Sequence, residues 1–104
     1  KINYNKIKAW KKHSKATMNI LVPFGEIKFV IYDNKNKIFY SEIIGEKYYN
    51  LLTIFPKVTF GFMGLNKPYS ILANLRNYIN DINEYKNIEI NKINFDWKKW
   101  KLLF

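Results

Sequence analysis

The sequence predicts an all-β protein, built as a sandwich or a small barrel rather than as an α/β fold. Two observations lead to this prediction. Short runs of alternating β-branched and aromatic residues recur at near-regular spacing, and turn residues such as glycine, proline and asparagine separate them. Beyond residue 78 the periodicity is weak, so we expect an irregular C-terminal tail there.

The expected elements follow one another along the chain. Gly25 gives the backbone freedom for a first turn, and Pro56 marks a later one. Glycines inside residues 58–65 suggest a bulge or a close approach of two backbones. A short helical turn is expected near residues 81–84, and Trp97 and Trp100 are expected to pack the tail onto the barrel. We expect strands over residues 19–23, 27–32, 37–44, 58–65 and 70–75.

The length and charge limit the possible functions. A chain of 104 residues indicates one domain, with a barrel over about residues 7–76 and a tail over about residues 77–104. The net charge of +10 favours anionic partners. A simple solvated lysine surface stays open as an alternative. Arg76 is the single arginine, whereas nucleic-acid readers usually carry more of them, so nucleic acid is the weaker prediction.

The residues that are missing exclude several kinds of chemistry. The absence of cysteine excludes disulfides, thiolate metal sites and cysteine nucleophiles. With a single histidine, His13, a conventional zinc or iron site is not expected, and we predict no metal and no cofactor. No apolar run approaches the roughly 20 residues of a transmembrane helix, so we expect a cytoplasmic protein without a membrane partner.

Several segments together carry a resemblance to a known family. The chain resembles the dTDP-4-dehydrorhamnose 3,5-epimerase family, and more closely a compact branch of sugar epimerases, over nearly all of residues 7–97. The matching segments are IKAWKKH (7–13), TMN (17–19), VPFGEIKFVIYD (22–33), LLTIFPKVTFGFMGL (51–65) and NFDW (94–97).

This resemblance implies both a fold and an activity. The fold would be the cupin double-stranded β-helix, or jelly roll, usually as a homodimer. The activity would be epimerisation of a keto-deoxysugar attached to a nucleoside diphosphate, in surface polysaccharide synthesis, without metal or cofactor. The family normally has further strands before the matching region, which residues 1–6 are too short to supply, so we expect either that the chain is truncated at its N-terminus or that those strands come from elsewhere.

The resemblance also implies site residues. Active members carry an R-G-L-H motif, and alignment of IKAWKKH puts Lys8 at the diphosphate-binding arginine and Lys11 at the catalytic base. His13 follows two residues later. Alternation places Lys11 and His13 on one face of a strand and turns Lys12 outward, so we assign Lys11 and His13 as catalytic and Lys8 as substrate-binding.

Two asparagines are further candidates for substrate binding. Asn19 and Asn74 interrupt otherwise apolar strands, and a sugar could satisfy their hydrogen bonds if they face the interior. The chain departs from the family pattern at two positions. The family has a second histidine where this chain reads Thr59–Phe62, and it has a tyrosine where this chain has Ala73. These departures leave open a cupin that binds a nucleotide sugar without turnover, or a small basic nucleic-acid-binding barrel.

Overall fold

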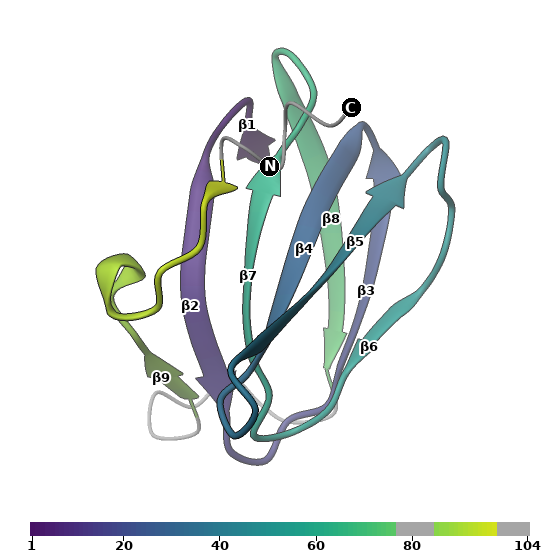
Figure 1. The fold of residues 1–104 in the computed structure, drawn as a ribbon. Helices are drawn as coiled ribbons and strands as arrows, with labels where there is room; N and C mark the ends of the chain where they lie inside the picture. Colours follow the sequence, from purple (N-terminus) through teal and green to yellow (C-terminus); the bar gives the residue numbers. More distant parts are fainter. Residues whose placement is uncertain (77–84, 98–104) are drawn as a thin grey trace.

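The fold consists of two antiparallel sheets packed face to face (Figure 1). The computed structural model describes residues 1–76 and 85–97. One sheet has four strands in the order β1-β8-β3-β6, and the other has five in the order β5-β4-β7-β2-β9. Strands that follow one another in the chain repeatedly cross from one sheet to the other, which is the arrangement of a jelly roll. The predicted all-β cupin fold is therefore confirmed.

Five of the observed strands begin and end within one residue of the expected ones, namely β3, β4, β5, β7 and β8. The strands are β1 (Ile2–Asn3), β2 (Ile7–His13), β3 (Met18–Phe24), β4 (Glu26–Asp33), β5 (Ile38–Gly45), β6 (Leu52–Ile54), β7 (Thr59–Gly64), β8 (Tyr69–Arg76) and β9 (Tyr85–Asn87). A 3-10 helix spans Ile90–Lys92.

Both ends of the chain contribute strands that the sequence did not predict. The first residues form β1, which pairs with β8, although we expected no strand before residue 7. Part of the expected irregular tail forms β9, which pairs with β2. Strands of two and three residues are too short for a periodic pattern, so alternation could not reveal them. The helical turn expected at residues 81–84 lies outside the described residues.

The predicted turn at Gly25 forms between β3 and β4. Its φ angle of +78° lies in the left-handed region, which favours glycine. A Cβ atom at this position would also run into the Ser70 hydroxyl, which donates a hydrogen bond of 3.0 Å to the carbonyl oxygen of Glu26. Glycine is therefore required here both by backbone conformation and by space.

Strand β2 contains a bulge opposite a glycine of β7. The pairing runs from Ala9 opposite Gly61 to Lys11 opposite Phe60, so that Trp10 is the extra residue. A Cβ atom on Gly61 would lie only 2.7 Å from the Cβ of Ala9, so a larger residue could not fit there. The glycine that suggested a close backbone approach lies at this point of contact.

The five-stranded sheet is covered on both sides. Its inner side packs against the other sheet around Ile27, Phe29 and Phe60, and its outer side is covered by the C-terminal segment over residues 93–97. Trp97, which is 5% exposed, packs there as the sequence predicts, whereas Trp100 lies outside the described residues. The outer cluster consists of Trp10, Val30, Met63 and Trp97, with Tyr32, Phe39 and Phe95 packed around them.

Candidate functional site

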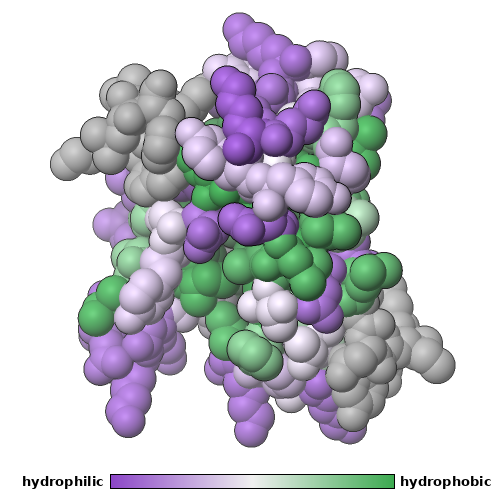
Figure 2. All heavy atoms as spheres, turned by 90° about the vertical axis from the view of Figure 1, so that its right-hand side faces the viewer, coloured by the Kyte–Doolittle hydropathy of each residue, from purple (hydrophilic) through white to green (hydrophobic). Residues whose placement is uncertain are grey.

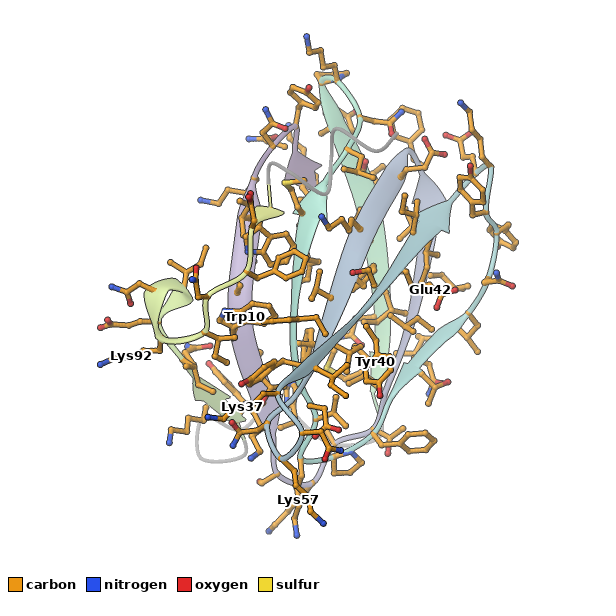
Figure 3. The ribbon with its side chains drawn as sticks, viewed as in Figure 1. Trp10, Lys37, Tyr40, Glu42, Lys57 and Lys92 are labelled. Carbon is orange, nitrogen blue, oxygen red and sulfur yellow. The ribbon has the colours of Figure 1, made fainter. Side chains whose placement is uncertain are left out.

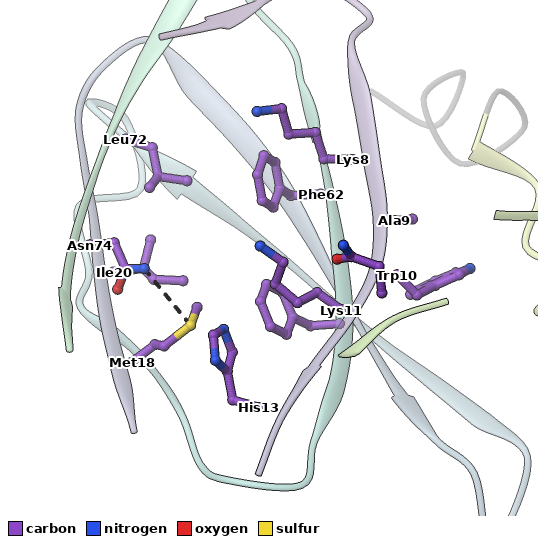
Figure 4. A pocket seen from close by; sticks show the side chains of 12 residues that line it. Lys8, Ala9, Trp10, Lys11, His13, Met18, Ile20, Phe62, Leu72 and Asn74 are labelled. Carbon is purple, nitrogen blue, oxygen red and sulfur yellow. Dashed lines mark hydrogen bonds between the residues drawn. The ribbon is translucent and has the colours of Figure 1, made fainter. Parts of the chain in front are cut away.

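A cavity of about 400 Å³ lies between the two sheets (Figure 4). Its volume falls within the range of about 300–1,000 Å³ that is typical of ligand pockets. We call it the inner cavity. It is lined by Lys8, Ala9, Trp10, Lys11, His13, Met18, Ile20, Phe60, Phe62, Leu72, Asn74 and Asn87. These residues come from β2, β7 and β9 of one sheet and from β3 and β8 of the other.

Three basic side chains of β2 border the inner cavity. Lys8 and Lys11 point from the strand into it, and His13 lies below them (Figure 4). Alternation alone would turn Lys8 and Lys11 to opposite sides, because three positions separate them. The bulge at Trp10 shifts the alternation by one residue, so both lysines reach the cavity while the indole points away from it.

His13 is held between aromatic rings. Its side chain is only 3% exposed, and its imidazole stacks on Phe60 with the ring centroids 6.2 Å apart and the planes inclined by 12°. On another side it contacts Tyr85 of β9, at 5.7 Å between centroids. The Lys11 ammonium lies 4.5 Å from the centroid of the same tyrosine ring, where the π electrons attract it. Tyr85 therefore contacts both predicted catalytic residues.

The rest of the lining combines apolar side chains with two amides. Asn74 reaches in from β8, and its amide lies 3.8 Å from the sulfur of Met18 (Figure 4). Asn87 contributes from β9. No aspartate or glutamate is among the described residues that line the inner cavity. A partly enclosed cavity with two ammonium groups and no carboxylate among its described lining residues attracts an anionic ligand.

Asn19 does not lie where the sequence led us to expect it. On β3 the side chains of Met18 and Ile20 line the inner cavity, so alternation turns Asn19 to the opposite side of the sheet. There its side-chain oxygen accepts a hydrogen bond of 2.8 Å from the Thr53 hydroxyl. The expectation that Asn19 faces the interior is corrected: it is a cross-strand partner on the outer surface.

Sequence reasoning missed the contribution of β9. Asn87 lines the cavity and Tyr85 contacts His13 and Lys11, yet both belong to the segment expected to be an irregular tail. Only the pairing of β9 with β2 brings them to the site. The one sequence signal is that these two residues are separated by a single position, as alternation along a strand requires.

Metal ligands and membrane segments can also be assessed for the described residues. Across residues 1–76 and 85–97, no group of three or more histidine, cysteine, aspartate or glutamate side chains is placed to hold a metal ion. In the same part of the chain, no helix is long and apolar enough to cross a membrane.

Another buried cation lies on the opposite side of the five-stranded sheet. Lys28 of β4 is fully buried in the outer cluster, with its ammonium 5.0 Å from the ring centroid of Phe95 and 5.3 Å from that of Trp97. Burial lowers the pKa of this ammonium from 10.5 to about 7, and the Asp96 carboxylate partly opposes the shift. Lys28 is not among the residues that line the inner cavity.

Comparison with known proteins gives structural matches. No family model matches the sequence, and no curated protein sequence matches it. The dTDP sugar isomerase from Desulfovibrio desulfuricans G20 is similar to this chain with a TM-score of 0.84 and 29% sequence identity. The match covers 92% of this chain and 66% of that one.

More distant structures share the fold alone. The capsular polysaccharide assembling protein CapF from Staphylococcus aureus matches with a TM-score of 0.76 at 13% identity, over 85% of this chain and 24% of that one. Drosophila melanogaster CENP-C, solved bound to CAL1, matches with a TM-score of 0.64 at 13% identity, over 72% and 58% of the two chains. This chain thus spans less than two thirds of these proteins. It has the cupin jelly-roll fold and resembles a dTDP sugar isomerase in structure.

Proposed function

We propose that this protein is a sugar-nucleotide epimerase or isomerase of the cupin type. One observation carries the proposal: a buried histidine, His13, borders a ligand-sized cavity into which two lysines of the same strand, Lys8 and Lys11, also point. The similarity to a dTDP sugar isomerase supports a nucleotide-linked sugar as the substrate class.

The proposed reaction moves one proton at a carbon next to a carbonyl. The imidazole of His13 takes the proton, and the C–H electron pair moves to the carbonyl oxygen to give an enolate. The ammonium of Lys11, on the same side of β2, stabilises the negative oxygen. Solvent then donates a proton to the opposite face of the carbon, which restores the carbonyl and inverts the centre, and His13 releases the proton that it took to solvent. The reaction has no net change in composition.

Substrate binding would use the remaining polar groups of the inner cavity. Lys8 is the second ammonium of β2 that borders the inner cavity, and we assign it to the diphosphate, because a dianion gains most from a positive charge in a partly enclosed site. Asn74, on the facing strand β8, would donate a hydrogen bond to a sugar oxygen. A role in surface polysaccharide synthesis, a homodimer and a cytoplasmic location complete the proposal.

A protein that binds the nucleotide sugar without turnover is the second candidate. It is favoured by the stretch Thr59–Phe62, where the family has a second histidine that this chain lacks. His13 is the one imidazole of the sequence, so a single copy of this chain cannot supply both histidines. The two candidates share the binding site and differ only in proton transfer.

The test is exchange of solvent deuterium into a dTDP-linked 4-keto-6-deoxysugar, followed by NMR in D₂O. We expect incorporation next to the carbonyl with the wild type and a rate about 10²–10⁴-fold lower with His13→Gln, which is the range that a general base contributes. Lys92→Gln is the control, because this exposed lysine of the 3-10 helix loses one charge away from the inner cavity.

Each other outcome has a definite meaning. If the wild type binds the sugar nucleotide but exchanges no deuterium, the protein is a binder and the catalytic proposal is wrong. If His13→Gln exchanges as fast as the wild type, another group is the base. If the wild type neither binds nor exchanges, the likeness to sugar isomerases is restricted to the fold.

A further inference from the structure

We propose that a second cavity, separate from the inner cavity, binds a phosphate-type anion. This cavity has a volume of about 420 Å³ and lies where β2 and β4 end and β7 begins. We call it the terminal cavity. Its lining consists of Lys12, Ile31, Tyr32, Asp33, Asn34, Lys35, Lys57, Val58 and Thr59. The proposal goes beyond the proposed function, which concerns the inner cavity alone.

Three neighbouring strands form the base of the terminal cavity. Thr59 of β7 pairs with Lys12 of β2 on one side and with Tyr32 of β4 on the other, so these residues form a row across the sheet. Thr59 is buried, at 5% exposure. The row supplies one ammonium and two hydroxyl groups, which are the usual donors to phosphate oxygens outside the backbone.

Two turns add further lysines to the rim. Lys35 comes from the turn between β4 and β5, and Lys57 from the turn between β6 and β7. Figure 3 shows Lys57 at this end of the sandwich, with Lys37 of the first turn above it. Residues far apart in the sequence thus place three ammonium groups, including that of Lys12, around one concave surface.

The one carboxylate at the terminal cavity is already engaged. Asp33 accepts backbone hydrogen bonds from Lys35 at 3.0 Å and from Asn36 at 3.2 Å, and a third bond of 2.8 Å from the Asn36 amide. These bonds lower the pKa of the Asp33 carboxyl, which stays ionised. Asp33 is the one acidic residue among the described residues of the lining, so three positive charges face a single negative one.

The turn at Lys57 has a backbone conformation that glycine could also adopt. Its φ angle of 69° is left-handed, where glycine would carry no steric strain and lysine does. Its N–H donates a hydrogen bond of 2.6 Å to the carbonyl oxygen of His13, which fixes the turn against the end of β2. Lys37 in the neighbouring turn is also left-handed, at 57°. Replacement of Lys57 by glycine would therefore remove the ammonium and keep the backbone of this turn.

The two cavities lie on opposite sides of β2. Lys11 and His13 border the inner cavity, whereas Lys12 between them borders the terminal cavity. Among the residues that the structure describes, none lines both cavities. An anion in the terminal cavity would therefore leave the inner cavity open to its own ligand.

Titration with inorganic pyrophosphate tests the proposal. Amide resonances of the ¹⁵N-labelled protein report on each cavity separately, Thr59 and Lys35 for the terminal cavity and Leu72 and Ile20 for the inner one. We expect the Thr59 and Lys35 resonances to shift and to saturate, and the affinity for pyrophosphate to fall as the NaCl concentration is raised. Thymidine diphosphate is the second probe: an equal affinity would mean that only the diphosphate is recognised, and a higher one that the nucleoside also contacts the protein.

A double variant separates the two sites. Lys35→Gln with Lys57→Gly removes two ammonium groups, and glycine relieves the left-handed backbone rather than disturbing the fold. We expect at least a tenfold weaker response of Thr59 to pyrophosphate, with the response of Leu72 and Ile20 unchanged, while Lys92→Gln alters neither. The proposal is overturned if pyrophosphate shifts only the inner-cavity resonances, or if the folded double variant binds as the wild type does at Thr59.

Discussion

The two sides of the five-stranded sheet hold lysine ammonium groups under different conditions. On the inner side, Lys8 and Lys11 border a cavity that a ligand can enter. On the outer side, Lys28 is enclosed under Phe95 and Trp97, and burial lowers its pKa to about 7. A cation next to a cavity can therefore attract an anion, whereas a cation enclosed by aromatic rings costs stability.

The surfaces of the protein differ as well. The side shown in Figure 2 carries apolar residues at its centre and polar ones around them. Several large side chains of β5 and of the segment after it are exposed, among them Tyr40, Tyr49 and Phe55. The outer cluster, in contrast, keeps its aromatic rings covered, because the segment over residues 93–97 packs across it. Covering a sheet face thus depends here on the C-terminal segment.

The largest expected effect concerns the outer cluster. Trp10 is 1% exposed and contacts four aromatic rings: those of Tyr32, Phe39, Phe95 and Trp97. We expect Trp10→Ala to lower the free energy of unfolding by about 3–5 kcal/mol, because it leaves a large hole in packed surroundings. Urea unfolding measures this change. Ile90→Ala, at an exposed position, should change stability by less than about 0.5 kcal/mol. A loss as small for Trp10→Ala would show that the outer cluster contributes little.

Removal of the Lys28 charge is expected to change the free energy of unfolding by less, and in the opposite direction. Lys28→Met keeps most of the side-chain volume and removes the buried charge, so we expect stability at pH 7 to rise by about 1–3 kcal/mol. The cation–π contacts with Phe95 and Trp97 reduce the gain, by about 1 kcal/mol each. A loss of stability in this variant would mean that these contacts outweigh the cost of burial.

The pH dependence of stability provides a second test of the cost of burying the Lys28 ammonium. Between a folded pKa of about 7 and the usual 10.5, the unfolded chain holds more protons at Lys28 than the folded chain does. The cost of the charge is therefore fully present below pH 7 and diminishes as the pH rises through this window. We expect the unfolding free energy of the wild type to increase from pH 7 to 9 by up to about 1 kcal/mol per unit. In Lys28→Met this increase should disappear.

The smallest effect is expected for a substitution at Lys8, on the inner side of the five-stranded sheet. Lys8→Gln removes one ammonium that a diphosphate could contact, so we expect binding of thymidine diphosphate to weaken about tenfold, which corresponds to about 1.4 kcal/mol. Calorimetric titration at low ionic strength measures it, with Lys92→Gln as the control. Unfolding of Lys8→Gln should match the wild type, since this side chain is exposed. Unchanged affinity would remove Lys8 from the proposed binding site.

Much of the fold and part of the site could be predicted from alternation alone. It predicted five of the six longer strands to within one residue at each end, and it placed Lys11 and His13 together because they are two positions apart. Alternation could not place Lys8 on the same side of β2 as Lys11 and His13, because the bulge at Trp10 arises from the pairing of β2 with β7 at Gly61.

The remaining differences have equally local reasons. Asn19 was expected to face the interior because it interrupts an apolar strand, but only the position of its neighbours decides which side it faces. Asn87 reaches the inner cavity, and Tyr85 contacts His13 and Lys11 beside it, through a three-residue strand without detectable periodicity. Lys28 looks like any strand lysine until the C-terminal segment is placed over it.

The bulge in β2 also bears on how such a protein can change over evolutionary time. It assigns Trp10 to the outer cluster, and Lys8, Lys11 and His13 to the inner cavity. Substitutions that alter what the cavity accepts therefore need not alter the packing that keeps the chain folded. A library randomised at the three cavity positions should retain folded members at a much higher frequency than one randomised at positions 9, 10 and 61. The seven residues of β2 would then allow ligand preference to diverge while the fold is kept.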